Sequence, residues 1–458
     1  MLLVRVLDLI KVKLMIQRLV LFFSVILTTL VFAQASAVVG QAEGAVNPWP
    51  EVRKERINML LPRALEAAEV DAWVILCREN NNDPLADHVG CENAGAPAAY
   101  VFYRLSDEKG GSKFHSLVFS PSSEATALAE LEIHDKVVSV PRGESALEQA
   151  AEFIQKHDFQ SIAVNSSTNN AQADGLSYTQ RLALEKALGD KFAQRLVSSE
   201  ELVYEWLAIK LPQEGDIMRE AAGLTAQWQI EAYKQIVPGK TTDADVSRFL
   251  KAKMAEHGVT DAWAPDQNPN VNSGPDRGHS HATNKVIMPG DVIQTDFGIK
   301  VHGRWVSDIQ RFAYVLKPGE TEPPEDIQHY WESARAGGRA AFEAMKPGVR
   351  GIDVDAAQSV LMKQKGSEHV MWSTGHPVGY VAHDTGPNLG GSRGATVRPA
   401  AKKKLKAGMV FAFDGFHAWK RDDGTSKTIS VEEMAVITED GVEYLIPPQQ
   451  ELILIPSE

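Results

Sequence analysis

Acidic residues interrupt three otherwise apolar, strand-like segments in the second half of the chain. Asp296 ends VIQTD, Asp414 ends GMVFAFD, and Glu432 lies inside TISVEEMAVIT. A carboxylate inside an apolar strand costs free energy unless it is paired or binds a metal ion. For Glu432 the alternative is an edge strand whose side chain reaches water. If its strand is buried, the carboxylate of Glu432 therefore needs such a partner.

The spacing of a fourth carboxylate, Asp308, from Asp296 also points to a cation site. Asp308 begins SDIQRFAYV after the turn IKVHGRWV, so a hairpin would place Asp296 and Asp308 symmetrically about His302. Directly opposed residues on neighbouring strands have Cβ atoms about 5 Å apart and share a face. Two carboxylates placed so repel each other unless a cation lies between them. Each Asp alone is more simply explained as a turn former at a strand end, so the pair carries the prediction.

Two histidines accompany these carboxylates in the sequence. His376 lies in STGHPVGYVAH, where neighbouring glycines allow close approach to a ligand, and His383 follows seven residues later. A single His in such a loop is usually only a loop residue. Together with the four carboxylates, an imidazole completes an oxygen-rich set that suits Mn²⁺, Co²⁺ or Zn²⁺ in a paired site. Bridging carboxylates can hold two ions about 3.5–4 Å apart and generate hydroxide at neutral pH.

The distribution of apolar segments predicts two folded domains. Short strand-like runs alternate with helical patterns over residues 51–200, which is typical of an α/β domain. A long helical stretch, broken around Pro212 and Gly215, opens a second region at 201–458. A hydrophobic content of 44% with 23% charged residues is an ordinary globular balance and excludes bulk disorder.

The N-terminus differs from the rest of the chain in charge. Residues 1–37 hold four basic residues and one acidic residue, an uncharged run from Leu19 to Ala33, and the small-residue site Ala35-Ser36-Ala37. This pattern predicts a secretory signal peptide, followed by a leader or linker at 38–50. The alternative is an uncleaved membrane anchor, although an anchor needs about 20 apolar residues. We expect a periplasmic or secreted protein with no stable membrane insertion after cleavage.

Charge and cysteine content exclude further classes of protein. The formal net charge of −13 argues against a nucleic-acid partner, which would need a basic patch. Cys77 and Cys91 are too few for a disulfide framework or a thiolate metal cage. The sequence leaves open whether they form one disulfide in an oxidising compartment or stay free thiols.

Four segments carry a resemblance to a known family. DFGIKVHGRWVSDIQR, GHPVGYVAHD, GMVFAFDGF and VEEMAVITEDG occur in the order found in the pita-bread metallopeptidases. That family includes methionine aminopeptidase, aminopeptidase P and prolidase, with metal-free creatinase as a relative. The resemblance covers about residues 205–450, and the preceding segment resembles the N-terminal domain of the creatinase and aminopeptidase P branch. It implies an α+β fold, with a pita-bread catalytic domain behind an α/β N-terminal domain.

The resemblance also implies the roles of the metal-site residues. Asp308 and Glu432 would bridge two divalent metal ions, manganese foremost, with cobalt or zinc as alternatives. Asp296 would complete the shell of one ion, and His376 and Asp414 the shell of the other.

Two histidines and a carboxylate are implied as catalytic. The upstream catalytic His matches His279, with His281 as its rival two residues later. His383 matches the second substrate-facing His, and Glu432 or a nearby carboxylate would move the proton.

The sequence departs from the family pattern at several positions. Asp414 stands where Glu is usual, and its carboxylate reaches about 1.5 Å less far; Gly415 replaces the Pro that follows. Ser430 lies where proline-cleaving members tend to carry Arg, and Trp372 replaces a His common in aminopeptidase P. The last two departures weaken the prediction of proline specificity more than the prediction of hydrolysis.

Together with the predicted signal peptide, the resemblance implies an exported, homodimeric metallopeptidase that hydrolyses the N-terminal bond of short peptides, with Xaa-Pro bonds as the narrower candidate. One alternative is a metal-independent, creatinase-like hydrolase of a small amide or guanidino compound. Another is a non-catalytic peptide-binding relative. Creatinase has lost acidic ligands, whereas all five positions here keep a ligating side chain, which favours the metallopeptidase.

Overall fold

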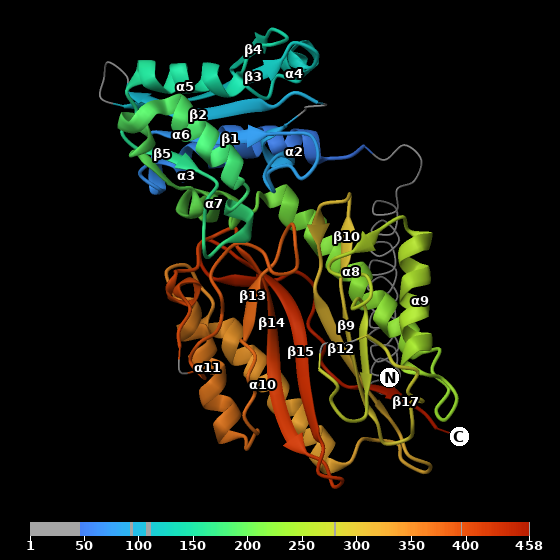
Figure 1. Ribbon diagram of the computed structural model, residues 1–458. Helices are drawn as coiled ribbons and strands as arrows, with labels where there is room; N and C mark the ends of the chain where they lie inside the picture. The colour runs from blue at the N-terminus through green and yellow to red at the C-terminus, as the bar shows by residue number, and fades with distance from the viewer. Residues whose placement is uncertain (1–45, 92–94, 107–110, 279–280, 395, 458) are drawn as a thin grey trace, which may run out of the picture.

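The computed structural model describes residues 46–91, 95–106, 111–278, 281–394 and 396–457. The predicted signal peptide (1–37), most of the leader and His279 lie outside the described residues. Figure 1 shows an N-terminal domain stacked on a larger C-terminal domain. Within the described ranges, no helix combines the length and the apolar character needed to cross a membrane.

The N-terminal domain is built on a mixed six-stranded sheet. Its strands are β1 (Ala72–Cys77), β2 (Ala98–Ser106), β3 (Ser112–Pro121), β4 (Lys136–Val140), β5 (Ile162–Val164) and β6 (Leu196–Ser198). Their spatial order is β4-β3-β2-β1-β5-β6, with β2 antiparallel to both β1 and β3 and the other pairs parallel. All of β1 is buried because its sequence, AWVILC, presents apolar side chains to both faces of the sheet.

Helices cover both faces of this sheet. They are α2 (Trp49–Glu55), a π-helical turn (Arg56–Leu60), α3 (Leu61–Ala67), α4 (Ala125–Glu130), α5 (Ala146–His157), α6 (Tyr178–Ala193) and α7 (Glu200–Leu207). Val74 packs with α5 and α6 on one face, whereas its neighbour Trp73 packs with α3 and α7 on the other. This division follows from the alternation of side chains along a strand.

Two helices open the C-terminal domain, α8 (Pro212–Tyr233) and α9 (Asp243–Glu256). The predicted break near Pro212 is observed as the start of α8, because proline fits the first helical turn, where its missing amide hydrogen is not needed. Thr242 caps α9: its hydroxyl accepts a hydrogen bond from the amide of Asp245.

Two four-stranded sheets form the centre of this domain. The first has the order β17-β12-β9-β8 and contains β8 (Asn270–Ser273), β9 (Val292–Phe297), β12 (Ile309–Val315) and β17 (Ile453–Ile455). The second has the order β13-β14-β15-β16 and contains β13 (Gly375–Pro377), β14 (Val410–Lys420), β15 (Ser426–Ile437) and β16 (Val442–Tyr444). A small sheet joins β7 (Thr260–Asp261), β10 (Ile299–Val301) and β11 (Trp305–Val306). The remaining helices are α10 (Glu325–Ala344) and α11 (Gly351–Gln364).

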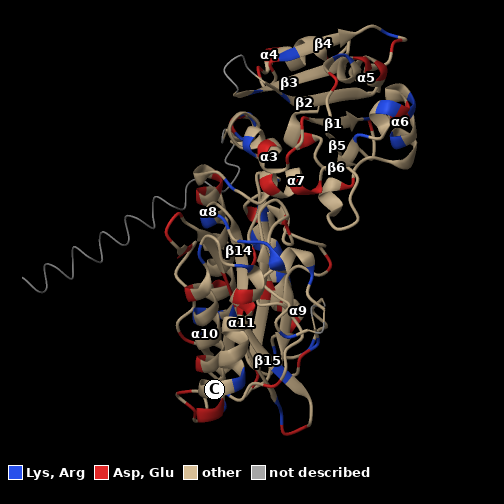
Figure 2. Cartoon of the chain, turned by 90° about the vertical axis from the view of Figure 1, so that its left-hand side faces the viewer, with Lys and Arg blue, Asp and Glu red and all other residues tan. Residues whose placement is uncertain are grey.

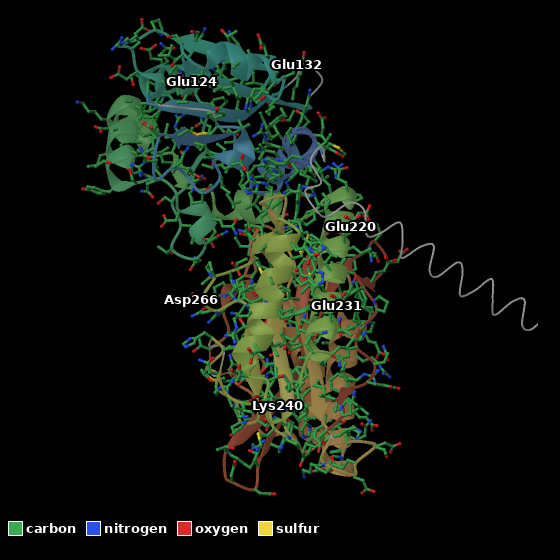
Figure 3. The ribbon with its side chains drawn as sticks, turned by 90° about the vertical axis from the view of Figure 1, so that its right-hand side faces the viewer. Glu124, Glu132, Glu220, Glu231, Lys240 and Asp266 are labelled. Atoms are coloured by element: carbon green, nitrogen blue, oxygen red, sulfur yellow. A yellow bond between two sulfur atoms is a disulfide. The ribbon has the colours of Figure 1, made fainter. Side chains whose placement is uncertain are left out.

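The helices of this domain flank its sheets. Figure 1 shows α8 and α9 on one side of the strands and α10 and α11 on the other. Figure 2 shows acidic and basic residues interspersed along the chain in both domains. Figure 3, from the opposite side, shows Glu124 and Glu132 on the N-terminal domain and Glu220 and Glu231 on the C-terminal domain. Charges of both signs in this mixed pattern are typical of a surface that faces water.

Candidate metal centre

The β14–β15 pair places two of the predicted metal ligands directly opposite each other. In the antiparallel register, Asp414 of β14 is the partner of Glu432 of β15. Both residues are buried, with relative exposures of 8% and 3%. Opposed like charges destabilise a pair of strands, and burial adds to this cost because water cannot screen them. This arrangement requires a compensating charge or protonation.

The other two predicted carboxylates also lie beside each other, but in a different register from the expected one. Asp296 of β9 is the partner of Gln310 on β12, not of Asp308. The prediction that Asp296 lies directly opposite Asp308 is therefore wrong by two residues. At the hairpin tip, Val301 of β10 pairs with Trp305 of β11, so the turn is centred on residue 303 and not on His302. In an alternating strand, a shift of two residues keeps the same face. Asp308 is thus a diagonal neighbour of Asp296.

His376 connects the two sheets at this point. It lies on β13, paired with Ala412 of β14. Its Nε2 atom is 3.8 Å from Oδ2 of Asp308 and 3.7 Å from Oε1 of Glu432. Ligand atoms of these three residues all lie within 4.8 Å of one another, so they can hold a common metal ion.

The electrostatics of the cluster favour a cation. Burial raises the pKa of Asp308, Asp414 and Glu432 well above their usual values, and the charges of neighbouring carboxylates, Asp296 among them, raise it further. Oε2 of Glu432 is buried and has no hydrogen-bond donor among the described residues. Hard carboxylate oxygens beside one imidazole suit Mn²⁺, Co²⁺ or Zn²⁺. The residues present therefore fit divalent metal ions.

An amide network that the sequence reasoning missed supports the carboxylates. Gln310 donates from Nε2 to Oδ1 of Asp414 at 3.4 Å. Its Oε1 accepts hydrogen bonds from Nε2 of Gln294 at 2.6 Å and from Oγ of Ser430 at 2.8 Å. The signal was present in the sequence, because Gln294 lies two residues before Asp296 and Gln310 two residues after Asp308, on the same strand faces. Ser430 thus orients a neutral amide here.

The packing around Gly415 explains why a glycine stands where Pro is usual. A Cβ atom at this position would collide with the carbonyl oxygen of Ala334 and lie 2.8 Å from the amide nitrogen of Gly338. Both of these atoms belong to α10. The missing side chain therefore allows α10 to pack closely against β14, next to Asp414.

The structure brings one of the three candidate histidines to the metal ligands. The ring of His383 is 4.3 Å from the ring of His376, and both line the same cleft. His281 is exposed and is not among the residues that line this cleft. His279 lies outside the described residues, so its role stays a prediction.

The ligands lie in a cleft of about 1280 Å³ that both domains line. The N-terminal domain contributes residues 168–172 and Tyr204. The C-terminal domain contributes the five predicted ligands and a set of large apolar side chains, which are Trp263, Met371, Trp372 and Phe416. Trp372 is 42% exposed and lines this cleft with Met371. Such a partly closed cleft can enclose a small organic molecule.

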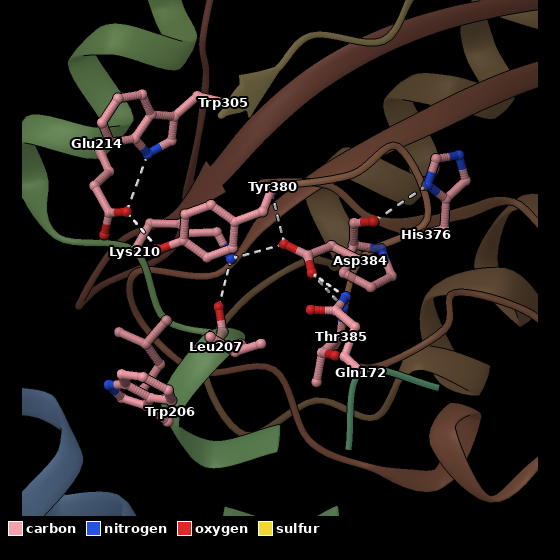
Figure 4. Close-up of polar contacts among 12 residues, drawn as sticks. Gln172, Trp206, Leu207, Lys210, Glu214, Trp305, His376, Tyr380, Asp384 and Thr385 are labelled. Carbon is pink, nitrogen blue, oxygen red and sulfur yellow. Dashed lines mark hydrogen bonds and ion pairs between the residues drawn. The ribbon is translucent and has the colours of Figure 1, made fainter. Parts of the chain in front are cut away.

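Beside the cleft, the structure also shows buried ion pairs that the sequence reasoning did not identify. Lys210 pairs with Asp384, and Arg56 pairs with Glu214. Figure 4 shows Tyr380 beside Lys210, Asp384 and Glu214. Their partners lie far apart in the sequence, so no local pattern marks them.

Four carboxylates and an imidazole, gathered from two central sheets between flanking helices, form a candidate metal centre within a fold of the pita-bread class. Residues 216–439 match the model of metallopeptidase family M24, in agreement with the resemblance seen in the sequence. The family implies divalent metal ions.

Relatives and solved structures agree with this assignment. The probable dipeptidase PepE of Mycobacterium tuberculosis is 26% identical over 251 residues, which are 54% of this chain and 61% of that protein. The Xaa-Pro dipeptidase of Pyrococcus furiosus is 24% identical over 259 residues, 56% of this chain and 67% of that protein. The crystal structure of dipeptidase PepE from Mycobacterium ulcerans aligns with a TM-score of 0.64 at 20% identity, covering 89% of this chain and 99% of that chain.

The sequence match covers only part of the relatives, and the structural match concerns the fold. The matched segment spans less than two thirds of the M. tuberculosis relative. The structural likeness, at 20% identity, establishes the fold. It confirms the predicted α+β class, with a pita-bread domain behind an N-terminal domain.

Proposed function

We propose that this protein is a dinuclear metallopeptidase that hydrolyses the N-terminal bond of short peptides. The observation that carries the proposal is the buried group of Asp308, His376 and Glu432, whose ligand atoms all lie within 4.8 Å of one another, with Asp414 directly opposite Glu432. Such a cluster is costly unless cations neutralise it. Manganese is the first candidate, with cobalt and zinc as alternatives.

Different residues would hold the metal ions and accept the proton in such a reaction. Asp308 and Glu432 would be shared by the two ions, with Asp296 on one side and His376 and Asp414 on the other. When bound, the ions would polarise the scissile carbonyl and lower the pKa of the attacking water. Glu432 or a neighbouring carboxylate accepts the proton of that water.

Substrate binding falls to the histidines and to the cleft walls. The imidazole of His383 faces the same cleft as His376 and donates a hydrogen bond to the carbonyl oxygen as it becomes negative. His279, or His281 in its place, would hold the substrate from the other side. Because residues 168–172 line the cleft from the N-terminal domain, a short peptide fits better than a folded chain.

Proline specificity is the narrower part of the proposal. The Xaa-Pro dipeptidase of P. furiosus is among the relatives and supports Xaa-Pro substrates. Ser430 and Trp372 replace residues typical of proline-cleaving members, and Ser430 holds a neutral amide instead of presenting a cation. We therefore propose Xaa-Pro peptides as one class among several short peptides.

Export and self-association complete the proposal. Cys77 and Cys91 form a disulfide, with Cα atoms 6.4 Å apart. Disulfides persist mainly in oxidising compartments, which supports a periplasmic or secreted location and agrees with the N-terminal leader. The resemblance to the pita-bread family supports a homodimer, and light scattering after size exclusion would measure its mass.

The test is hydrolysis by the full chain after metal removal and reloading. Protein dialysed against EDTA should lose activity on a panel of dipeptides and Xaa-Pro peptides, and Mn²⁺ should restore it. Full hydrolysis in excess EDTA by protein without detectable metal would instead favour the creatinase-like alternative. No hydrolysis under any metal condition would favour the peptide-binding alternative.

A further inference from the structure

A buried ion pair lies next to the loop that carries both cleft histidines. Nζ of Lys210 is 3.2 Å from Oδ2 of Asp384, and the two side chains are 2% and 0% exposed. Lys210 lies in the short connection between α7 and α8, and Asp384 directly follows His383. Figure 4 shows the pair in contact with the ring of Tyr380, whose centroid is 4.9 Å from Nζ.

Asp384 fixes the turn that contains His383. Its Oδ2 accepts a hydrogen bond from the amide of Tyr380 at 3.0 Å, and its Oδ1 accepts one from the amide of Thr385 at 2.8 Å. These two amides lie on either side of His383 in the sequence. The Asp384 carboxylate therefore spans the turn and sets the direction in which the His383 side chain leaves it.

The same loop also fixes His376. The amide of Asp384 donates to the carbonyl of Pro377 at 3.0 Å. Nδ1 of His376 lies 3.3 Å from this same carbonyl oxygen. A shift of Asp384 would therefore move the backbone oxygen that contacts the ring of His376.

The N-terminal domain holds this arrangement from outside. Nε2 of Gln172 donates to Oδ1 of Asp384 at 2.8 Å. On the other side of Tyr380, the phenol donates to Glu214 at 2.5 Å, and Arg56 pairs with Glu214 at 2.6 Å. Arg56 belongs to the π-helical turn of the N-terminal domain, a feature often found at functional sites. Gln172 thus contacts the histidine loop directly, whereas Arg56 reaches it through Glu214 and the face of the Tyr380 ring.

The sequence leaves space for the ion pair. A Cβ atom at Gly379 would collide with Cε of Lys210 and with Oδ2 of Asp384. A glycine at this position therefore lets the backbone approach the pair. Because a buried ion pair stabilises a fold no better than apolar side chains of similar size, its value here is orientation.

We propose that Lys210 and Asp384, held by Gln172 of the N-terminal domain, are positioning residues that set the orientation of His383 and His376. The proposal rests on the proposed function, because these histidines act on the substrate and on the metal ions. The N-terminal domain is then a working part of the active centre. Residues that orient metal-bound histidines typically change metal affinity or activity by 10–100-fold when they are replaced.

Three variants of the full chain test this. Asp384→Asn removes the charge, Gly379→Ala pushes the pair apart without removing a charge, and Gln172→Ala removes the half-buried amide from the N-terminal domain. Asp83→Asn is the matched control, because Asp83 is another buried aspartate, which accepts hydrogen bonds from Asn165 and from the amide of Leu85. Each variant is measured for kcat and KM on a dipeptide, for Mn²⁺ affinity by calorimetry, and for Tm.

We expect kcat to fall about 10–100-fold in Asp384→Asn and Gly379→Ala, with KM changed less and Mn²⁺ affinity lowered. Gln172→Ala should lower kcat with no change in Tm, which keeps the test decisive even if Asp384→Asn fails to fold. Asp83→Asn should lower Tm alone. Changes in Tm alone in all of the variants would overturn the positioning proposal. If the wild-type chain cleaves no peptide, the proposed function fails, and the Mn²⁺ affinities alone decide the positioning proposal.

Discussion

Replacing Glu432 by glutamine should stabilise the metal-free protein, although most changes at buried positions destabilise. Glu432 is the cross-strand partner of Asp414 and lies close to His376 and Asp308. Without a cation, burial raises the pKa of the Glu432 carboxylate, and the like charges beside it raise the pKa further. The amide of glutamine keeps nearly the same shape but removes one of these charges and offers a hydrogen-bond donor to its neighbours.

The pairing of Asp414 with Glu432 sets the size of the expected stabilisation. Opposed residues have Cβ atoms about 5 Å apart, and two unit charges at that distance repel by about 3 kcal/mol at an effective dielectric constant of about 20. Protons taken up by the cluster relieve part of this repulsion, so we expect a gain of about 1–3 kcal/mol at pH 8. For a domain of this size, each kcal/mol changes Tm by about 2–4 °C.

The stability of the metal-free protein should also depend on pH in a defined direction. Because the pKa of Glu432 is raised in the folded chain, the folded state binds more protons than the unfolded state above about pH 4. The stability from this group is complete below the unfolded pKa and is lost as pH rises through the folded pKa. Metal-free wild type should therefore lose Tm on this rise, and Glu432→Gln should lose less.

The adjacent residue provides the control. Glu433 points to the opposite face, where Arg311 donates to both of its carboxylate oxygens at 3.1 Å. Glu433→Gln breaks this buried pair and should destabilise the protein by about 3–5 kcal/mol. Thermal unfolding of both variants in EDTA and in Mn²⁺ makes the comparison. A lower Tm for Glu432→Gln in EDTA, or an undiminished rise of its Tm with Mn²⁺, would refute the reasoning.

Three further outcomes follow from the same geometry. His376→Ala should weaken Mn²⁺ binding at least tenfold in calorimetry, since the imidazole contacts both Asp308 and Glu432; an unchanged affinity would contradict its role as a ligand. His383→Ala should keep Mn²⁺ binding but lower kcat by about 100-fold in steady-state assays, whereas loss of the metal would show that His383 is itself a ligand. Cys77→Ser should lower the free energy of unfolding in urea by about 3 kcal/mol without reductant, because the disulfide closes a short loop; equal stability would contradict the bond.

Strong local patterns made much of the C-terminal domain predictable. The long helical stretch predicted after residue 201 is observed as α7 and α8, and its predicted break near Pro212 falls between them. The strands around Asp414 and Glu432 were predicted because long apolar runs with one acidic residue are unusual and easily located. The five predicted ligands line one cleft because these runs lie on adjacent strands of the two sheets.

The strand register and the contacts between residues far apart in the chain could not be predicted from the sequence. The symmetric spacing of Asp296 and Asp308 suggested direct opposition, but the backbone at the hairpin tip, where His302 has a positive φ of 51°, shifts the pairing by two residues. The Arg56–Glu214 pair joins residues 158 positions apart, and no periodic pattern encodes such a contact. Cys77 and Cys91 could be paired only once their Cα distance was known.

Metal content tests the central claim most directly. Full-length protein, loaded with Mn²⁺ and dialysed against metal-free buffer, should retain two ions per chain in elemental analysis. Asp414 and Glu432 are buried and face each other across β14 and β15, so two like charges oppose each other at this position. Protein that retains no metal, yet cleaves short peptides in EDTA, would contradict the account.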